Sequence, residues 1–399
     1  MVVLYIITLI LNGVLFIYGA YFGITCSLPF LKKERKIKIY KPKYKFAILI
    51  AARNEEKVIS HLIDSLKEQN YPKDMYEIFV IPNNCSDKTE EISLEHGAKI
   101  ITVPFKTKTK GEVLNYTFKY FSNNDKYDTY VIFDADNVAH PDFLMETNNK
   151  LCEGYQVVEG FRDTKNPYDN WISSSYAIFY YLQNLFLYES RMRIGKSANL
   201  NGTGYAITKE LIESLHFNAK TITEDIELST VCAIHDIKIA YQKNAIFYDE
   251  QVTSFKASIK QRKRWSKGTL EILKYYAKDL LNTMQKTKNL HSFDMLCVNL
   301  AVPIQLIGLM GTVLTFIACL DIKLMIISGI ITYLANVLMS LFLTIYYHKN
   351  VKKMLPGILL FALFIFTWLP ISIYALVSKD NRWDPINHSR KVDIKELID

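Results

Sequence analysis

The chain has 399 residues, enough for one sizeable domain with additional elements. Its net charge is +8, from 48 basic and 40 acidic residues, and basic clusters at 32–36, 262–267 and 349–353 lie beside apolar segments. This placement favours contact with anionic lipid and phosphate over nucleic acid, although any single cluster could be a solubilising surface. Six scattered cysteines without a C-x-x-C pair argue against a zinc site and a disulfide framework.

Apolar residues are unevenly spread: 1–30 and 293–379 are strongly hydrophobic, whereas 31–290 has the composition of a soluble domain. The first run has no basic segment before it and no small-residue cleavage site after it. It is long enough to span ~30 Å of hydrocarbon at ~1.5 Å per residue. We therefore expect an uncleaved helix with its N-terminus outside and residues from 31 onward in the cytoplasm.

Residues 46–163 alternate between strand and helix patterns. The expected strands are 46–52, 76–81, 100–105 and 129–133, and the expected helices are 55–69, 88–96 and 112–120. This order predicts an α/β fold with a mostly parallel sheet covered by helices on both faces. Ligands of such sheets lie beyond the carboxyl ends of the strands, where we find Asn54, Asn84, Asp134 and Asp136.

From 164 to 290 the pattern is mixed. The aromatic segment 176–188 predicts a helix, and 256–284 predicts a basic helix pair in the membrane interface. Ordinary helical core is the alternative for both.

Three further apolar stretches, 296–320, 324–347 and 356–378, follow, and Pro303 and Pro370 can kink two of them. Four plain crossings would leave the basic tail 380–399 outside, against the charge rule. A kinked, re-entrant last segment would resolve this conflict.

Asp134-Ala135-Asp136 places two carboxylates one residue apart at the end of an expected strand. Hard oxygen ligands on a short turn suit Mg²⁺ or Mn²⁺, with a nucleoside diphosphate supplying further ligands. A solvated turn is the alternative for such a short motif.

Thr223-Glu224-Asp225 opens an expected helix. A carboxylate in a partly desolvated cleft can act as a general base, and we assign this role to Asp225. Plain helix capping by Thr and Asp is the alternative.

Gln261, Arg264 and Trp265 lie on another expected helix. Arg264 can hold a pyrophosphate, and Trp265 offers a flat apolar face for a ring. A snorkelling arginine and an anchoring tryptophan are the alternative. Lys110 could reach a phosphate, and the glycines of 200–205 let backbone approach a ligand closely.

In this order and context, D-A-D, T-E-D and Q-x-x-R-W resemble the membrane-embedded family 2 glycosyltransferases. That family includes bacterial cellulose and β-glucan synthases, poly-N-acetylglucosamine synthases and hyaluronan synthases. The resemblance covers about residues 1–380. It implies a Rossmann-like GT-A domain on the cytoplasmic side, a UDP-sugar donor and inversion at the anomeric carbon.

The resemblance also implies a role for each matched residue. Its nucleotide-binding residues are Ala52, Asn54, Glu55, Asn84, Lys110, Asp134 and Arg264. Its acceptor-binding residues are Asn201, Gly202, Gly204, Gln261 and Trp265. Asp225 matches the catalytic base, with Glu224 beside it, and Asp134 and Asp136 match the site of Mg²⁺ or Mn²⁺.

The chain departs from the family pattern in two places. Asn83-Asn84-Cys85 stands where many relatives carry acidic residues, and no F-x-V-T-x-K gating segment follows the Q-x-x-R-W motif. The tail 383–388 could serve as a nucleotide lid if it is cytoplasmic.

The expected organisation is an N-terminal transmembrane helix (1–30), a cytoplasmic GT-A domain (31–255), amphipathic interface helices (256–292), transmembrane helices (293–379) and a tail (380–399). We expect about four transmembrane helices in a multi-pass protein of the plasma membrane. In synthases of the family that the chain resembles, the membrane helices form a channel that exports the growing sugar chain. A channel built from about four helices is narrow or needs a second copy of the protein, so a homo-oligomer is possible.

The first functional hypothesis is a processive inverting synthase that polymerises UDP-glucose into a cellulose-like or mixed-linkage β-glucan and exports it. A poly-N-acetylglucosamine or hyaluronan-type synthase is an alternative. Another is a non-processive lipid glycosyltransferase resembling ceramide glucosyltransferases. The third hypothesis is a protein that is not an enzyme: a transporter or receptor with a degenerate nucleotide-sugar fold. It predicts that Asp225 is dispensable for function.

Overall fold

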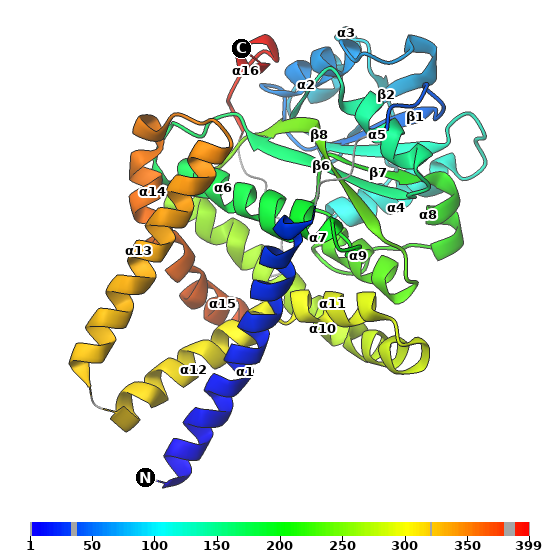
Figure 1. Ribbon diagram of the computed structural model, residues 1–399. Coiled ribbons are helices and arrows are strands. Elements are labelled where there is room, and N and C mark those ends of the chain that lie inside the picture. Colours follow the sequence, from blue (N-terminus) through cyan, green and yellow to red (C-terminus); the bar gives the residue numbers. More distant parts are fainter. Residues whose placement is uncertain (1, 33–37, 320, 379–387, 399) are drawn as a thin grey trace.

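The computed structural model describes residues 2–32, 38–319, 321–378 and 388–398. A compact α/β region carries a group of long apolar helices that extend away from it (Figure 1). The described chain is therefore organised as a layered domain beside a helical, membrane-type segment.

One mixed sheet forms the centre of the α/β region, with the strand order β3-β2-β1-β4-β7-β6-β8-β5. The strands are β1 (Phe46–Ala52), β2 (Tyr76–Pro82), β3 (Lys99–Ile100), β4 (Thr129–Asp134), β5 (Val138–Ala139), β6 (Val157–Thr164), β7 (Tyr205–Thr208) and β8 (Ile239–Asp249). Strands β3, β2, β1 and β4 pair in parallel, and β6 pairs in parallel with β8. Strand β7 runs antiparallel to both β4 and β6, so β4, β6 and β8 end at the same edge as β1.

Strand β1 shows why the apolar run FAILIAA becomes a central strand. Its alternate residues feed two separate cores: Ala47 and Leu49 join one, and Phe46 and Ile48 join the other. All four are fully buried. A strand buried on both faces needs a continuous apolar sequence rather than an alternating one.

Helices cover both faces of the sheet (Figure 1). Helices α2 (Ile59–Lys67), α3 (Thr89–Glu95) and α5 (Phe143–Cys152) pack on one face, and α4 (Lys110–Phe121), α6 (Trp171–Leu182), α8 (Lys209–Leu215) and α9 (Glu224–Ile234) pack on the other. A π-helix, η3 (Gln183–Glu189), and α7 (Ser190–Met192) continue α6, and two short 3₁₀ turns are η1 (Leu28–Leu31) and η2 (Lys73–Met75). The predicted α/β class with a mostly parallel sheet is confirmed.

Two element boundaries were wrong. The third strand ends at Ile100 instead of Phe105, because the following loop leaves the sheet: the carbonyl of Thr107 accepts hydrogen bonds from Arg53 (2.9 Å) and Asn84 (2.9 Å). The first helix begins at Ile59 rather than residue 55. Asn54 has a left-handed backbone (φ 58°), which turns the chain before the helix can start.

The prediction of a helix pair over residues 256–284 was also wrong. The segment is one long helix, α10 (Phe255–Thr287), and not a pair. A second helix, α11 (Leu290–Asn299), follows it, capped by the side chain of Asn289, which accepts hydrogen bonds from two backbone N–H groups.

Among the described residues, four helical segments are long and apolar enough to cross a membrane: Val3–Leu31, Ala301–Ala318, Ile322–Tyr346 and Val351–Val377. They correspond to α1 (Val2–Ser27, with η1), α12 (Ala301–Cys319), α13 (Ile322–Tyr346) and the pair α14 (Val351–Phe366) and α15 (Trp368–Val377). The predicted number is confirmed. Pro303 lies in the first turn of α12, where a missing N–H is tolerated.

The last apolar segment is broken at Thr367, three residues before Pro370. After it, the chain returns to the α/β region: Ile394 packs with Val138 and Tyr248, and α16 (Lys395–Ile398) ends the described part (Figure 1). Residues 388–398 therefore lie on the same side as the domain, as a kinked last segment requires.

Candidate active site

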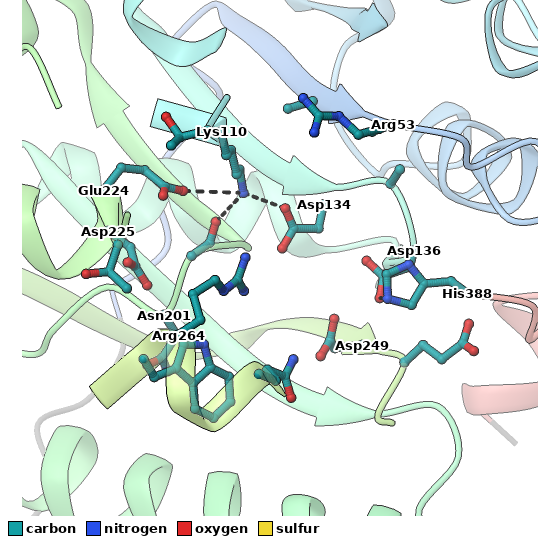
Figure 2. Close-up of a pocket in the computed structure, with 18 of the residues that line it drawn as sticks. Arg53, Lys110, Asp134, Asp136, Asn201, Glu224, Asp225, Asp249, Arg264 and His388 are labelled. Atoms are coloured by element: carbon teal, nitrogen blue, oxygen red, sulfur yellow. Dashed lines mark hydrogen bonds and ion pairs between the residues drawn. The ribbon is translucent and has the colours of Figure 1, made fainter. Parts of the chain in front are cut away.

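One cavity lies at the carboxyl ends of the parallel strands, where α4, α9 and α10 also meet (Figure 2). Its lining includes most of the site residues that the sequence analysis selected: Glu55, Lys110, Asp134, Asp136, Asn201, Gly202, Glu224, Asp225, Gln261, Arg264 and Trp265. These residues are far apart in sequence, and the shared edge of the sheet brings them together.

Lys110 is the electrostatic centre of this cavity. Its ammonium group lies 2.5 Å from Asp134, 2.6 Å from the carbonyl oxygen of Gly202 and 3.9 Å from Glu224 (Figure 2). Burial alone would lower the pKa of Lys110, but the carboxylates of Asp134 and Glu224 outweigh it and raise the pKa. A permanently charged lysine thus joins the strand end, the glycine loop and the start of α9.

Asp134 and Asp136 follow β4 on a tight turn. The backbone N–H of Asp134 donates to Thr203 (2.8 Å), which ties this turn to the glycine loop. Asp136 is buried, and burial raises its pKa to about 8, while the neighbouring charge of His388 opposes the shift. A carboxylate in this setting favours a cation beside it.

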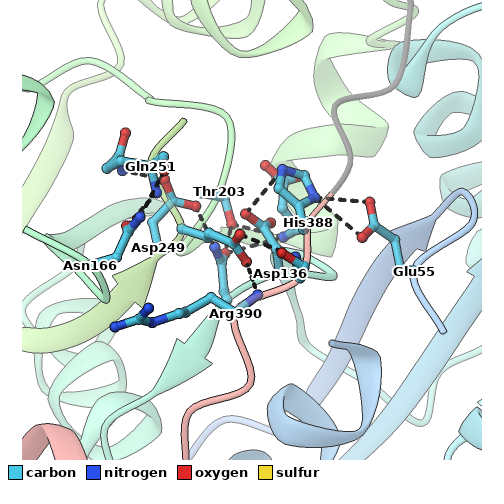
Figure 3. A network of polar contacts seen from close by, with 12 residues as sticks. Glu55, Asp136, Asn166, Thr203, Asp249, Gln251, His388 and Arg390 are labelled. Carbon is cyan, nitrogen blue, oxygen red and sulfur yellow. Dashed lines mark hydrogen bonds and ion pairs between the residues drawn. The ribbon is translucent and has the colours of Figure 1, made fainter. Parts of the chain in front are cut away.

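His388 from the C-terminal tail reaches this acidic turn (Figure 3). Its Nδ1 lies 3.1 Å from Glu55, and its Nε2 lies 3.5 Å from Asp136. Burial would lower the pKa of His388, but Asp136 and Glu55 raise it to about 10, so the imidazole is charged at neutral pH. Of the suggested nucleotide lid, residues 383–387 lie outside the described residues, and His388 occupies the cavity.

Glu224 and Asp225 begin α9 and point into the cavity. Thr223 makes no side-chain capping hydrogen bond, so the structure does not support capping by Thr223. Burial raises the pKa of Glu224 to about 7, against the opposing charge of Lys110. Burial also raises the pKa of Asp225, while backbone hydrogen bonding, Lys110 and Arg264 oppose the rise.

The glycine loop approaches Asp225 closely. Gly202 has φ +87°, and a side chain there would place its Cβ 3.4 Å from the Asp225 carboxylate. Gly204 is more constrained, because a Cβ would lie 2.0 Å from the ring of Phe247. The loop needs glycine at both positions to bring its backbone close to Asp225.

Helix α10 supplies the opposite wall through Gln261, Arg264 and Trp265. The Trp265 ring stacks against Trp368 at 6.0 Å and meets Tyr176 edge-on at 6.1 Å. An acceptor that rests on Trp265 would therefore lie above an aromatic cluster built from α6, α10 and α15.

Four predicted residues do not line the cavity. Ala52, Asn54, Asn84 and Gly204 shape the turns around it instead: Asn54 accepts from the Ser86 backbone (2.8 Å), and Asn84 donates to Thr107. The adjacent Ala51 and Arg53 line the cavity. The nucleotide roles of Ala52, Asn54 and Asn84 stay predictions.

Arg162 and Asp249 are site residues that the sequence reasoning missed. Arg162 donates to Asp249 (2.5 Å) and to the carbonyl of Asn201 (3.0 Å), and its guanidinium lies 4.1 Å from the centre of the Tyr180 ring. Asp249 in turn accepts from Asn137 (2.7 Å). The available signal for Arg162 was the presence of three charged residues in the strand VVEGFRDT, every residue of which is buried.

A divalent cation fits the acidic turn by its donor chemistry. The described residues contain no group of three or more acidic, His or Cys side chains arranged to hold a metal ion. Asp134 and Asp136 would thus supply protein oxygens, and a bound diphosphate would have to complete the coordination.

This combination of sheet, acidic turn and basic wall defines an α/β protein whose cavity suits a ligand that carries phosphate. Residues 42–268, more than half of the chain, match the family described as glycosyltransferase like family 2. The chain therefore belongs to the family 2 glycosyltransferases, as the sequence motifs indicated.

Three curated relatives illustrate the range of the family. The probable glycosyltransferase YdaM of Bacillus subtilis is 30% identical over 249 residues, covering 58% of this chain and 57% of the relative. The β-monoglucosyldiacylglycerol synthase of Trichormus variabilis is 27% identical over 63% of this chain and 54% of its own. The poly-β-1,6-N-acetyl-D-glucosamine synthase of Staphylococcus epidermidis is 25% identical over 64% of this chain and 61% of its own. The chain thus spans little more than half the length of these relatives.

A solved structure agrees with the fold along the chain. The mannosyltransferase PcManGT from Pyrobaculum calidifontis, in complex with GDP-Man and Mn²⁺, superposes with a TM-score of 0.61 at 15% identity. The match covers 94% of this chain and 100% of that one. The α/β region has the GT-A fold.

Proposed function

We propose that this protein is an inverting, metal-dependent hexosyltransferase that moves a sugar from a nucleoside diphosphate to an acceptor held at a membrane. One observation carries the proposal. Asp225, the Lys110–Asp134 pair, Asp136, Arg264 and Trp265 line one cavity whose acceptor wall is a helix packed against apolar, membrane-type helices.

The donor side of the reaction uses charge. A bound Mg²⁺ or Mn²⁺ held by Asp134 and Asp136 would neutralise the diphosphate. Arg264 faces the same space and stabilises negative charge as the nucleotide leaves. Lys110 keeps the Asp134 turn and the Gly202 carbonyl in place.

The acceptor side uses a base. Asp225 takes the proton from the acceptor hydroxyl as that oxygen attacks the anomeric carbon. A carbon–oxygen bond forms on one face, the bond to the diphosphate breaks on the other, and the configuration inverts. Burial raises the pKa of Asp225, which strengthens it as a base, and Gly202 leaves room for the acceptor beside it.

A membrane lipid is the acceptor class that the arrangement favours. The acceptor wall α10 packs along α15, so the cavity is tied directly to the apolar segments. A relative named for glucosyl transfer to a glycerolipid is consistent with this choice.

Processive synthesis of a β-glucan from UDP-glucose, with export across the plasma membrane, is the second candidate. The Trp265–Trp368 pair favours it, because stacked aromatic rings suit a sugar chain as well as a single sugar. A relative named as a polysaccharide synthase supports the same reading.

The test uses membranes or purified full chain with radiolabelled UDP-glucose, UDP-N-acetylglucosamine or GDP-mannose and Mg²⁺ or Mn²⁺. Label that extracts into organic solvent supports the lipid acceptor, and label in a chain degraded by a glycosidase supports the polymerase. Absence of incorporation from every donor would overturn the proposed function.

A further inference from the structure

The break in the last apolar segment lies against the motif helix of the active site. At the break, the carbonyl of Phe364 and the hydroxyl of Thr367 both accept hydrogen bonds from one terminal nitrogen of Arg262, at 2.9 Å and 3.0 Å. Arg262 stands between Gln261 and Arg264, which line the cavity. It is fully buried and turns away from the cavity that its neighbours line.

The setting of Arg262 is costly for a charged group. Within the part of the chain that the structure describes, it has no carboxylate partner, and its second terminal nitrogen has no hydrogen-bond partner. Its guanidinium lies 4.3 Å from the centre of the Phe364 ring and 5.5 Å from that of Trp368, which offsets part of the cost of burial. Burying a charge without a counter-ion costs free energy, so Arg262 is not expected to stabilise the fold. A role in positioning the helix is the alternative explanation for its burial.

The contacts of Arg262 continue along the two helices. After the break, α15 runs beside α10: Ser266 lies 3.3 Å from Ser372, and Lys267 donates to the carbonyl of Ser378 (3.0 Å). Ser372 also donates to Gln305 of α12 (3.1 Å). The motif helix is therefore held in register with two apolar helices, and the side chain of Arg262 connects it to the Phe364 carbonyl at the break.

We propose that Arg262 is a positioning residue that fixes α10 to the α14–α15 break and so sets the place of Arg264 and Trp265 relative to the membrane. This inference rests on the proposed function and adds to it the element that aligns a membrane acceptor with the catalytic base. The donor residues at the ends of β1 and β4 lie outside this clamp, and of the donor residues only Arg264 lies on α10. Loss of the clamp therefore affects transfer to the acceptor more than it affects binding of the donor.

The main variant is Arg262→Met, which keeps the length of the side chain and removes the buried charge. We expect transfer to the acceptor to fall about 10²-fold, the scale of a misplacement near 1 Å. Binding of the nucleoside diphosphate with Mn²⁺ should weaken much less than transfer, because Asp134 and Asp136 lie outside the clamp. The melting temperature should hold or rise, because an unpaired buried charge has gone. Lys274→Met is the matched control: it removes an exposed lysine from the same helix and should leave transfer unchanged.

Two further variants separate positioning from folding. Thr367→Val removes one acceptor at the break without changing size, and we expect a smaller loss of transfer in the same direction. Arg262→Lys keeps the charge but loses the planar fork and the ring stacking, so it should restore only part of the activity.

The outcomes are distinct. Absence of transfer by the wild-type chain from any donor would overturn the proposed function and this inference with it. Equal transfer by the wild type and Arg262→Met would overturn the inference alone. So would a variant that loses donor binding and thermal stability together with transfer, since that pattern marks a merely structural role.

Discussion

At the scale of single residues, burial is the main cause of the raised pKa values of the acidic side chains in the cavity. Glu224 and Asp136 are buried, Asp225 is partly buried, and burial raises the pKa of each. The cations Lys110, Arg264 and His388 stand against them. The result is an array of charges that a nucleotide and a metal ion would complete, rather than a balanced salt-bridge network.

Asp225→Asn should abolish base catalysis while leaving the cavity intact. We expect the rate of transfer to fall by about 10²–10⁴-fold, the usual contribution of a positioned base. Nucleoside diphosphate binding should persist, because the amide keeps the shape of the side chain. Transfer assays with calorimetric binding measure both quantities, and full activity of the variant would remove Asp225 from its role.

The pH dependence of transfer should carry the signature of Asp225. The base must be ionised, so activity should fall as the pH drops through the pKa of Asp225, which burial raises above its ordinary value. Arg264 lowers this pKa, so Arg264→Gln should move the acid limb of the profile to higher pH in addition to reducing the maximum rate. A limb that stays in place in the variant would assign the titration to another group.

The sequence predicted most of the residues that line the cavity but not the contacts between them. D-A-D, T-E-D and Q-x-x-R-W are local patterns, and the structure gathers them in one cavity. The Lys110–Asp134 contact joins residues 24 positions apart, and Arg162 reaches Asp249 across 87. No local pattern encodes such pairs, because they depend on which strands become neighbours.

At the scale of elements, close backbone packing sets the position of the motif helix. Gly268 on α10 faces Thr223, one residue before Glu224, and a Cβ there would lie 2.2 Å from the Thr223 hydroxyl oxygen. Helix α10 can therefore approach the start of α9 only because residue 268 has no side chain. The spacing of three residues from Trp265 to Gly268 ties the acceptor wall to the base.

Gly268→Ala should separate these two helices. Overpacking of this kind costs about 1–3 kcal/mol, and the shift displaces Trp265 from Asp225. We expect a lower melting temperature together with a larger loss of transfer than of donor binding.

Gly329→Ala is the control for Gly268→Ala. It is another glycine inside a helix, it has nothing within 4 Å of the added Cβ, and it should be neutral or slightly stabilising. A Gly268→Ala/Thr223→Ala double variant should recover part of the loss, because it removes two of the clashing atoms. No recovery would place the cause elsewhere.

Element prediction succeeded where periodicity was strong and failed where tertiary contacts decided. Strand β1 is recognisable because both of its faces are buried. Strand β3 is short because the loop after it turns away from the sheet, where the carbonyl of Thr107 accepts hydrogen bonds from Arg53 and Asn84. Hydrophobic periodicity carries no information about such contacts. Helix α10 continues through residue 287 because no proline or glycine breaker interrupts it after Gly268.

At the scale of the whole molecule, the apolar helices extend away from the α/β region, and the C-terminal tail packs on that region again. The N-terminal end of α1 and the start of α13 lie at the end remote from the α/β region (Figure 1). The tail instead packs on that region, with Val392 and Ile394 buried and His388 in the cavity. Sequence alone left the side of the tail open, because hydropathy counts a 27-residue segment as one crossing and does not see the break at Thr367.

This arrangement predicts opposite sides for two surface positions. In a background with all native cysteines replaced by serine, Asp321→Cys should react with a membrane-impermeant thiol reagent only from the side remote from the domain. Lys395→Cys, whose side chain is 76% exposed, should react only from the domain side. Inside-out and right-side-out vesicles, with detergent-opened vesicles as the control for reactivity, give the comparison. Labelling of both positions from one side would mean that α12 and α13 do not cross. The acceptor wall would then be tied to a surface-bound bundle, and a lipid acceptor would have to reach Trp265 from the interface rather than from within the bilayer.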